Sequence, residues 1–201
     1  MLLTSIEYLL VFILSVNIIY LLIFSIASHC PPKNQKIIVH VLNRIVILIP
    51  AYKEDQVVME CVNSCLTQNY PKEQYDIVVI SDQMQDSTLL KLEALPLKLI
   101  KVFFKDSTKA KALNYAMAEI GDNYDIAIIL DADNVVDSEF LLHINTSMNQ
   151  KGVEIVQAHR TAKNQNTKLA ILDAVSEEIN NSIFRLGHSN VGFSAALIGS
   201  G

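Results

Sequence analysis

Short apolar runs alternate with helical patterns along most of the chain. Continuous runs of about five apolar residues predict strands buried on both faces, as in a parallel sheet. Between these runs, apolar residues recur at helical spacing. This alternation predicts an α/β fold whose mostly parallel sheet is flanked by helices. The predicted strands are 45–49, 75–80, 97–103, 125–130 and 153–159, and the predicted helices are 56–68, 87–95, 109–120, 137–149 and 167–185.

The first residues follow a different pattern. Residues 6–27 are almost continuously apolar, with Glu7 as the one charged residue among them. A helix of this length rises about 33 Å, which is enough to cross a hydrocarbon core of roughly 30 Å. A cleaved signal peptide is the alternative, but it has a basic start and a shorter apolar core. Because residues 1–5 contain no Lys or Arg, we predict a transmembrane helix within residues 1–30.

The residues after this helix predict its orientation. Pro31 and Pro32 end the helix, and the positive charges Lys33, Lys36 and Arg44 follow it. Positive residues concentrate on the cytoplasmic side of a membrane. We therefore expect an inner or plasma membrane protein whose remaining chain faces the cytoplasm. The expected organisation is an anchor over 1–30, a linker over 31–43 and one α/β domain over 44–201.

Composition narrows the class of protein further. The chain has 201 residues, of which 51% are hydrophobic and 18% charged, and a net charge of −5. An acidic chain argues against a nucleic-acid partner, because such a partner needs a basic patch. The part after the anchor is large enough for one hydrophobic core. Cys61 and Cys65, four residues apart in a predicted helix, are expected to be buried thiols.

A pair of carboxylates follows the fourth predicted strand. The apolar run ends in Asp131 and Asp133, which are separated only by Ala132. A hard divalent ion such as Mg²⁺ or Mn²⁺ binds one or two carboxylates together with phosphate oxygens. Alternatively, Asp131 simply ends the strand and Asp133 forms a turn or caps the next helix. The pair alone does not decide between a metal site and a turn.

Other predicted strands also end in polar residues that packing does not require. In a parallel sheet, the loops after the strands converge at the carboxyl edge, where ligands bind. The resulting site would combine an aromatic ring, single carboxylates, a cation and the carboxylate pair. This assortment suits a nucleotide diphosphate bound with a divalent ion. The contributing loops are 50–55, 81–87, 105–109 and 131–134.

The order of these motifs resembles that of family 2 glycosyltransferases with the GT-A fold. The resemblance is closest to membrane-anchored members of the cellulose-synthase-like and N-acetylglucosaminyltransferase-like kind, and it covers about residues 44–201. The chain departs from the family at Thr108, where a glycine is frequent. The matching motifs are Ile49-Pro-Ala-Tyr-Lys-Glu54, Ser81-Asp82 with Asp86 following, Lys109-Ala-Lys-Ala-Leu-Asn114 and Asp131-Ala-Asp133.

The resemblance implies a role for individual residues. It implies that a nucleotide-sugar donor, usually linked to uridine, binds with a divalent metal, Mn²⁺ or Mg²⁺, against its diphosphate. The implied contacts are Ala51, Tyr52 and Glu54 to the nucleoside, Asp82 to the base, Lys109 to the nucleotide and diphosphate, Asp131 to the ribose and sugar, and Asp133, with Asp131, to the metal.

The resemblance also implies the reaction. Family members of this kind transfer a sugar with inversion to a glycan or lipid-linked acceptor, and build glycoconjugates or surface polysaccharides. In the family, the general base follows a glycine-rich stretch like Gly199-Ser-Gly201, so we expect the base beyond Gly201. This chain alone is then expected to hold a donor and to transfer poorly. The alternative is a catalytically incomplete, membrane-anchored module that binds nucleotide sugars.

Overall fold

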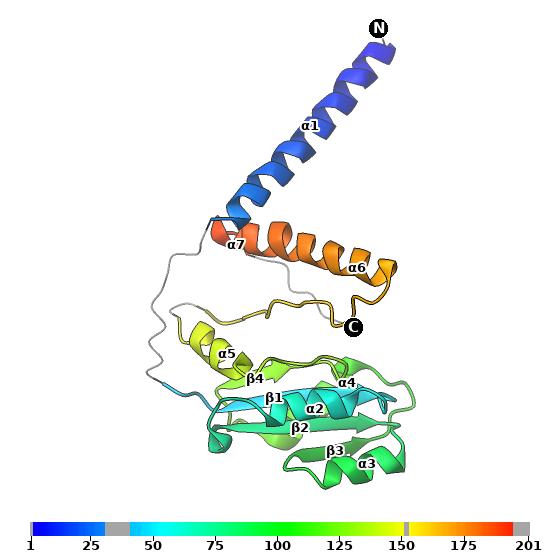
Figure 1. The fold of residues 1–201 in the computed structure, drawn as a ribbon, viewed down its shortest axis with the longest axis vertical. Coiled ribbons are helices and arrows are strands. Elements are labelled where there is room, and N and C mark those ends of the chain that lie inside the picture. The colour runs from blue at the N-terminus through cyan, green and yellow to red at the C-terminus, as the bar shows by residue number, and fades with distance from the viewer. Residues whose placement is uncertain (1, 31–40, 151–152, 195–201) are drawn as a thin grey trace. The chain divides into compact units, whose positions relative to one another are not determined.

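A computed structural model of the protein describes residues 2–30, 41–150 and 153–194 (Figure 1). The described residues form two compact units. One unit lies within residues 1–36 and 157–199, and the other lies within residues 37–156.

The larger unit contains a four-stranded parallel sheet. β1 (Ile45–Tyr52) pairs with both β2 (Tyr75–Asp82) and β4 (Ile126–Ile129), and β3 (Lys98–Val102) pairs with β2. The strand order is β3-β2-β1-β4. Residues 45–49 of β1 are buried on both faces, as their continuous apolar run predicts. The α/β class and the parallel sheet predicted from the sequence are confirmed.

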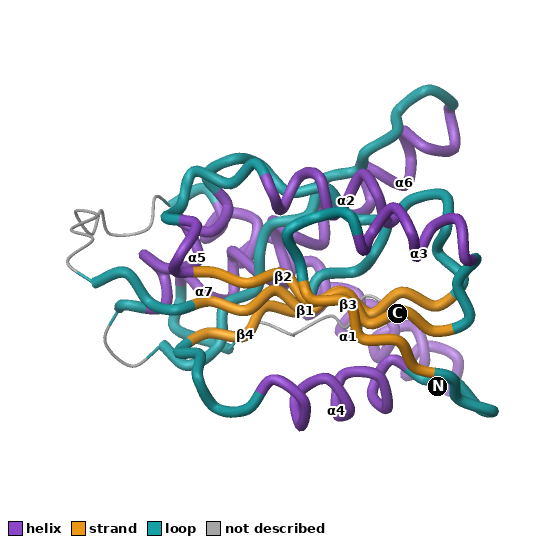
Figure 2. The backbone as a smooth tube through the Cα atoms, turned by 90° about the horizontal axis from the view of Figure 1, so that it is seen from below, coloured by secondary structure: helices purple, strands orange, loops and turns teal. Residues whose placement is uncertain are grey.

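Helices cover both faces of this sheet (Figure 2). α2 (Val58–Leu66) and α3 (Asp86–Glu93) lie on one face, and α4 (Lys109–Ile120) lies on the other. Side chains of a strand alternate between the two faces. The odd-numbered isoleucines of β1 therefore join the core under α2, while Val46 and Leu48 pack with buried alanines of α4.

α5 (Phe140–Met148) and the single turn η1 (Lys72–Gln74) complete the larger unit. Asn145 of α5 is fully buried and fixes the segment that enters β1. Its side-chain oxygen accepts from the backbone N–H of Asn43 at 3.1 Å, and its amide donates to the Val41 carbonyl at 2.9 Å. These bonds hold the start of the first strand against the last helix of the unit.

The predicted strand over residues 153–159 is wrong. These residues have no regular secondary structure. Val156 packs against the core of the sheet, Ile155 is 67% exposed, and the chain from Gln157 onward belongs to the other unit. Their β-branched residues favour a strand locally. A strand also needs a neighbour to pair with, and a stretch divided between two units has none in the described part of the chain.

The smaller unit joins the N-terminal helix to a C-terminal helical segment. α1 (Leu2–Ser28) is long and apolar enough to cross a membrane, by length and composition, with a mean hydropathy of 2.7 over its apolar part. α6 (Lys168–Ile179) continues into the π-helix η2 (Asn180–Gly187) and then into α7 (His188–Asn190). The single helix predicted over 167–185 is thus present, but its second half has a wider turn.

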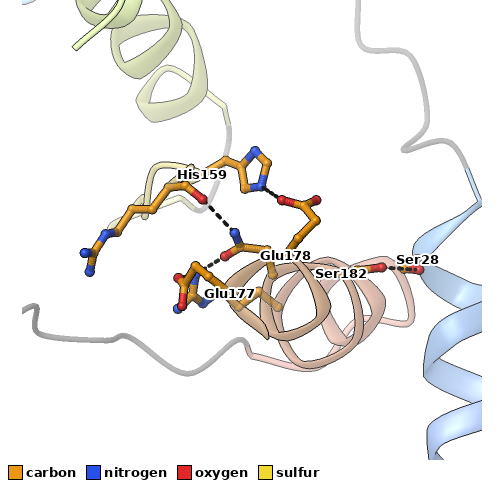
Figure 3. Close-up of polar contacts among 8 residues, drawn as sticks. Ser28, His159, Glu177, Glu178 and Ser182 are labelled. Carbon is orange, nitrogen blue, oxygen red and sulfur yellow. Dashed lines mark hydrogen bonds and ion pairs between the residues drawn. The ribbon is translucent and has the colours of Figure 1, made fainter. Parts of the chain in front are cut away.

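The carboxyl end of α1 packs against η2 and α7. The Phe24 and His188 rings lie 4.1 Å apart between centroids, and the Ser182 hydroxyl donates to the Ser28 hydroxyl at 2.9 Å (Figure 3). A Cβ at Gly187 would collide with the backbone carbonyl of Phe24. The close approach of α1 to η2 therefore requires glycine at this position.

We expect Gly187→Ala to separate α1 from η2, because a backbone carbonyl cannot move aside as a flexible side chain can. The measurement is disulfide formation between Ser28→Cys and Ser182→Cys in a Cys30→Ser background. The cross-linked fraction should fall several-fold when Gly187→Ala is added.

Ser189→Ala is the control, since Ser189 is exposed on α7 and its loss should leave cross-linking unchanged. Cross-linking that is as efficient with Gly187→Ala as with the control would show that the two helices do not depend on this contact.

Candidate functional site

A pocket of about 220 Å³ opens at the carboxyl edge of the sheet. Its walls are the carboxyl ends of β1 and β2, the loops after β1, β3 and β4, and the first turn of α4. The structure therefore brings together residues that lie far apart in the sequence. The predicted site residues that line this pocket are Ala51, Tyr52, Glu54, Asp82, Lys109, Asp131 and Asp133.

The pairing of β1 with β2 positions the first two polar side chains. β1 continues through Pro50 to Tyr52, beyond its predicted end, and Tyr52 pairs with Asp82 at the end of β2. The next residue of each strand, Lys53 and Gln83, has a φ of 55°. This left-handed conformation is uncommon for residues other than glycine and often occurs at binding sites. Both strands thus turn sharply directly after the residue that lines the pocket.

Asp82 carries an unpartnered carboxylate oxygen. The residue is 3% exposed, and its Oδ1 accepts no hydrogen bond from the described residues. Leaving such a group without a partner costs about 1–3 kcal/mol, and more when it is charged. Buried polar atoms without a partner need an explanation. A ligand that donates an N–H or O–H in the pocket would satisfy this oxygen.

The start of α4 contributes positive charge to the pocket. Lys109 is the first residue of this helix, and its Nζ lies 2.5 Å from Asp131 Oδ1. Thr108 caps the helix, because its hydroxyl accepts from the Lys111 N–H at 3.2 Å. The amino end of a helix carries a partial positive charge and attracts anions. Lys109 and this helix end together form a positive wall of the pocket.

Asp131 and Asp133 fit a metal that is bound together with a phosphate ligand. Ala132 between them is buried in the core, which anchors the loop that carries both carboxylates. Among the described residues, no group of three or more His, Cys, Asp or Glu could hold a metal ion. Mg²⁺ is commonly held by one or two carboxylates together with substrate phosphates. The donor set therefore fits a metal completed by a diphosphate better than a closed protein cage.

Cys61 supports this loop, a role that the sequence did not predict. Its thiol donates to the Asp131 carbonyl at 3.5 Å, and the Asn134 N–H donates to the same oxygen at 3.1 Å. A hydrogen bond with Cys65, burial and the nearby carboxylates keep the pKa of the Cys61 thiol above its ordinary value, so the thiol stays a neutral donor. Both cysteines are buried, as predicted. The contact with Asp131 depends on tertiary packing, which spacing does not reveal.

Comparison with known proteins assigns the chain to a family. Residues 46–197 match the family model described as Glycosyl transferase family 2. The chain belongs to this family. A Methanococcus voltae protein named dolichyl N-acetyl-alpha-D-glucosaminyl phosphate 3-beta-D-2,3-diacetamido-2,3-dideoxy-beta-D-glucuronosyltransferase is 26% identical over 157 residues. That alignment covers 74% of this chain and 45% of the relative.

A second relative is the poly(ribitol-phosphate) beta-N-acetylglucosaminyltransferase TarS of Staphylococcus aureus. It is 25% identical over 99 residues, which cover 47% of this chain and 17% of TarS. The chain thus spans less than half the length of either relative.

The fold has a counterpart among solved structures. The mannosyltransferase PcManGT from Pyrobaculum calidifontis, solved with GDP-Man and Mn²⁺, matches with a TM-score of 0.56 and 24% identity. The match covers 67% of this chain and 41% of that enzyme. The GT-A fold predicted from the sequence is confirmed by this likeness.

We expect Cys61→Ala to loosen the loop that carries Asp131 and Asp133. The variant removes one hydrogen bond, worth about 1 kcal/mol, so local opening should increase about fivefold. The measurement is hydrogen–deuterium exchange of the peptide over residues 130–136.

Cys65→Ala is the matched control, because it removes the same atom from the same buried side of α2 and leaves the Asp131 carbonyl untouched. Equal exchange in the two variants would mean that the Cys61 thiol does not hold the loop.

Proposed function

We propose that this chain is the donor-binding part of an inverting, metal-dependent glycosyltransferase that uses a UDP-sugar. One observation carries the proposal. In a family 2 chain, a single pocket combines the unpartnered carboxylate of Asp82, the cation Lys109 and the carboxylate pair Asp131 and Asp133. A nucleotide sugar with a divalent ion has a complementary group for each of these.

We assign the nucleoside to the side of the pocket formed by β1 and β2. The exposed Tyr52 ring offers a surface on which a base can stack, and buried Ala51 leaves room beside it. Asp82 Oδ1 would accept from an N–H of the base. Uracil and guanine both present such a group, and we propose uracil because the resemblance implies a uridine-linked donor. Glu54 would accept from the ribose hydroxyls.

We assign the diphosphate to Lys109 and the amino end of α4. Both attract phosphate oxygens. Asp133, with Asp131, would hold Mn²⁺ or Mg²⁺ against the diphosphate, and Asp131 would border the ribose and sugar. The metal, when bound, stabilises the negative charge of the departing nucleoside diphosphate.

The acceptor side and the membrane complete the proposal. Inverting transfer needs a base that takes the proton of the acceptor hydroxyl. The acceptor would be a glycan or a lipid-linked sugar.

We propose that α1 anchors the protein in an inner or plasma membrane and that the larger unit faces the cytoplasm. The second candidate function is a membrane-anchored module that binds nucleotide sugars without transferring them.

Calorimetric titration of the protein with UDP tests the metal site. We expect binding to require Mn²⁺ and Asp133→Ala to weaken the Mn²⁺-dependent binding about tenfold or more, equivalent to at least about 1.4 kcal/mol. Asp122→Ala, an exposed carboxylate outside the pocket, is the control and should bind normally. UDP binding that is equally strong without Mn²⁺ and in Asp133→Ala would refute the metal assignment.

Asp82→Asn tests the assignment of the base. We expect UDP affinity to fall about tenfold to a hundredfold, since a hydrogen bond to a charged group is worth about 1.5–3 kcal/mol. Without ligand, the free energy of unfolding should rise, because the unpartnered buried charge is removed. The measurements are UDP titration, with GDP as the competing nucleotide, and denaturant unfolding.

Asp76→Asn is the matched control on the same strand. Its carboxylate accepts from Tyr124 at 2.8 Å and pairs with Arg44 at 3.3 Å, so its loss should lower stability and leave UDP affinity unchanged. Parallel effects of the two variants would argue against a ligand role for Asp82.

A further inference from the structure

α6 exposes its larger apolar side chains to solvent, while its partly buried residues are Ala170, Ala174 and Glu177. Leu172 is 65% exposed, and Val175 and Ile179 are each 50% exposed. Asn181, just beyond the helix, is only 5% exposed. A helix on the surface of a soluble domain has the opposite arrangement, with its apolar stripe against the core. Three adjoining apolar side chains are therefore at least half exposed in the described part of this unit.

The segment before α6 covers the polar side. The Asn181 amide donates to the Arg160 carbonyl at 2.9 Å, and His159 Nε2 lies 3.0 Å from Glu178 Oε2. Glu177 pairs with Arg185 at 3.0 Å (Figure 3). These contacts fix the rotation of the helix about its own axis. The apolar side is therefore held in its exposed position.

The apolar side of α6 lies opposite the side that is bonded to the segment of His159 and Arg160. Figure 3 shows the helix end-on, with the segment of His159 above it and the end of α1 beside it at the right. At roughly 100° per residue, Leu172, Val175 and Ile179 lie within about 60° of one another and nearly opposite Asn181. The contacts of Ser28 with Ser182 and of Phe24 with His188 hold this geometry.

We propose that α6 lies in the membrane surface, with Leu172, Val175 and Ile179 inserted at the boundary between lipid headgroups and acyl chains. This inference rests on the proposed anchoring by α1, whose carboxyl end packs on the same helical segment. An interfacial helix inserts its apolar side about 5–10 Å into this boundary. Because α1 is proposed to cross the membrane and packs on the same helical segment, the lipid surface would lie next to α6.

The charges of the helix indicate which lipids it needs. Asp173, Glu177 and Glu178 outnumber Lys168 and Arg185 between residues 168 and 187. Attraction to anionic headgroups therefore does not drive the insertion, and apolar burial does. A surface of phosphatidylcholine is sufficient.

Tryptophan fluorescence of the full chain tests the proposal, since the protein has no Trp of its own. Leu172→Trp, Asp173→Trp and Phe12→Trp are reconstituted separately in phosphatidylcholine vesicles with and without brominated acyl chains. Asp173 is the matched control, because it is exposed one residue away on another side of the helix. Phe12, exposed in the middle of α1, reports on the anchor.

We expect bromolipid to quench Leu172→Trp several-fold more than Asp173→Trp, with strong quenching of Phe12→Trp. Equal quenching at 172 and 173, with Phe12→Trp quenched, would overturn the inference and leave the anchor intact. Blue-shifted but unquenched emission at 172 would overturn it in favour of a protein cover, such as a second copy. An unquenched Phe12→Trp would remove the anchor and this inference together. The UDP titration is independent of all these outcomes.

Discussion

Parallel pairing of β1 with both of its neighbours is the constraint on which the site depends. Because β1 runs in the same direction as β2 and β4, the polar residues that follow each strand emerge at one edge. The pairing of Tyr52 with Asp82 sets two side chains of the pocket side by side. The burial of β1 between two layers of helices keeps this arrangement rigid, so that loops far apart in sequence can form one pocket.

Some features of the pocket lower the stability of the fold and favour ligand binding. Asp82 is buried with an oxygen that nothing in the described chain satisfies, and Lys53 and Gln83 adopt strained backbone conformations beside the two residues that line the pocket. Folding tolerates these costs because the surrounding sheet is well packed. A ligand that satisfies Asp82 recovers part of the cost on binding, which makes its affinity depend on the rigidity of the sheet.

The sequence predicts features that arise from local patterns and misses those that arise from packing. Apolar runs located all four strands, and the polar residues after them located the pocket. Residues 153–159 have the composition of a strand but are divided between two units, so local propensity failed there. The wider turn of η2 and the bond from Cys61 to the Asp131 carbonyl depend on contacts between distant segments. No residue spacing carries that information.

The π-helical turn of η2 has a consequence for how this segment tolerates change. Its eight residues, Asn180–Gly187, lie directly before His188, whose ring packs on Phe24. Deleting one residue here would rotate everything that follows by roughly a quarter of a turn and turn that ring away from α1. The length of this segment is therefore constrained together with Gly187, and relatives that keep the helix junction should keep both.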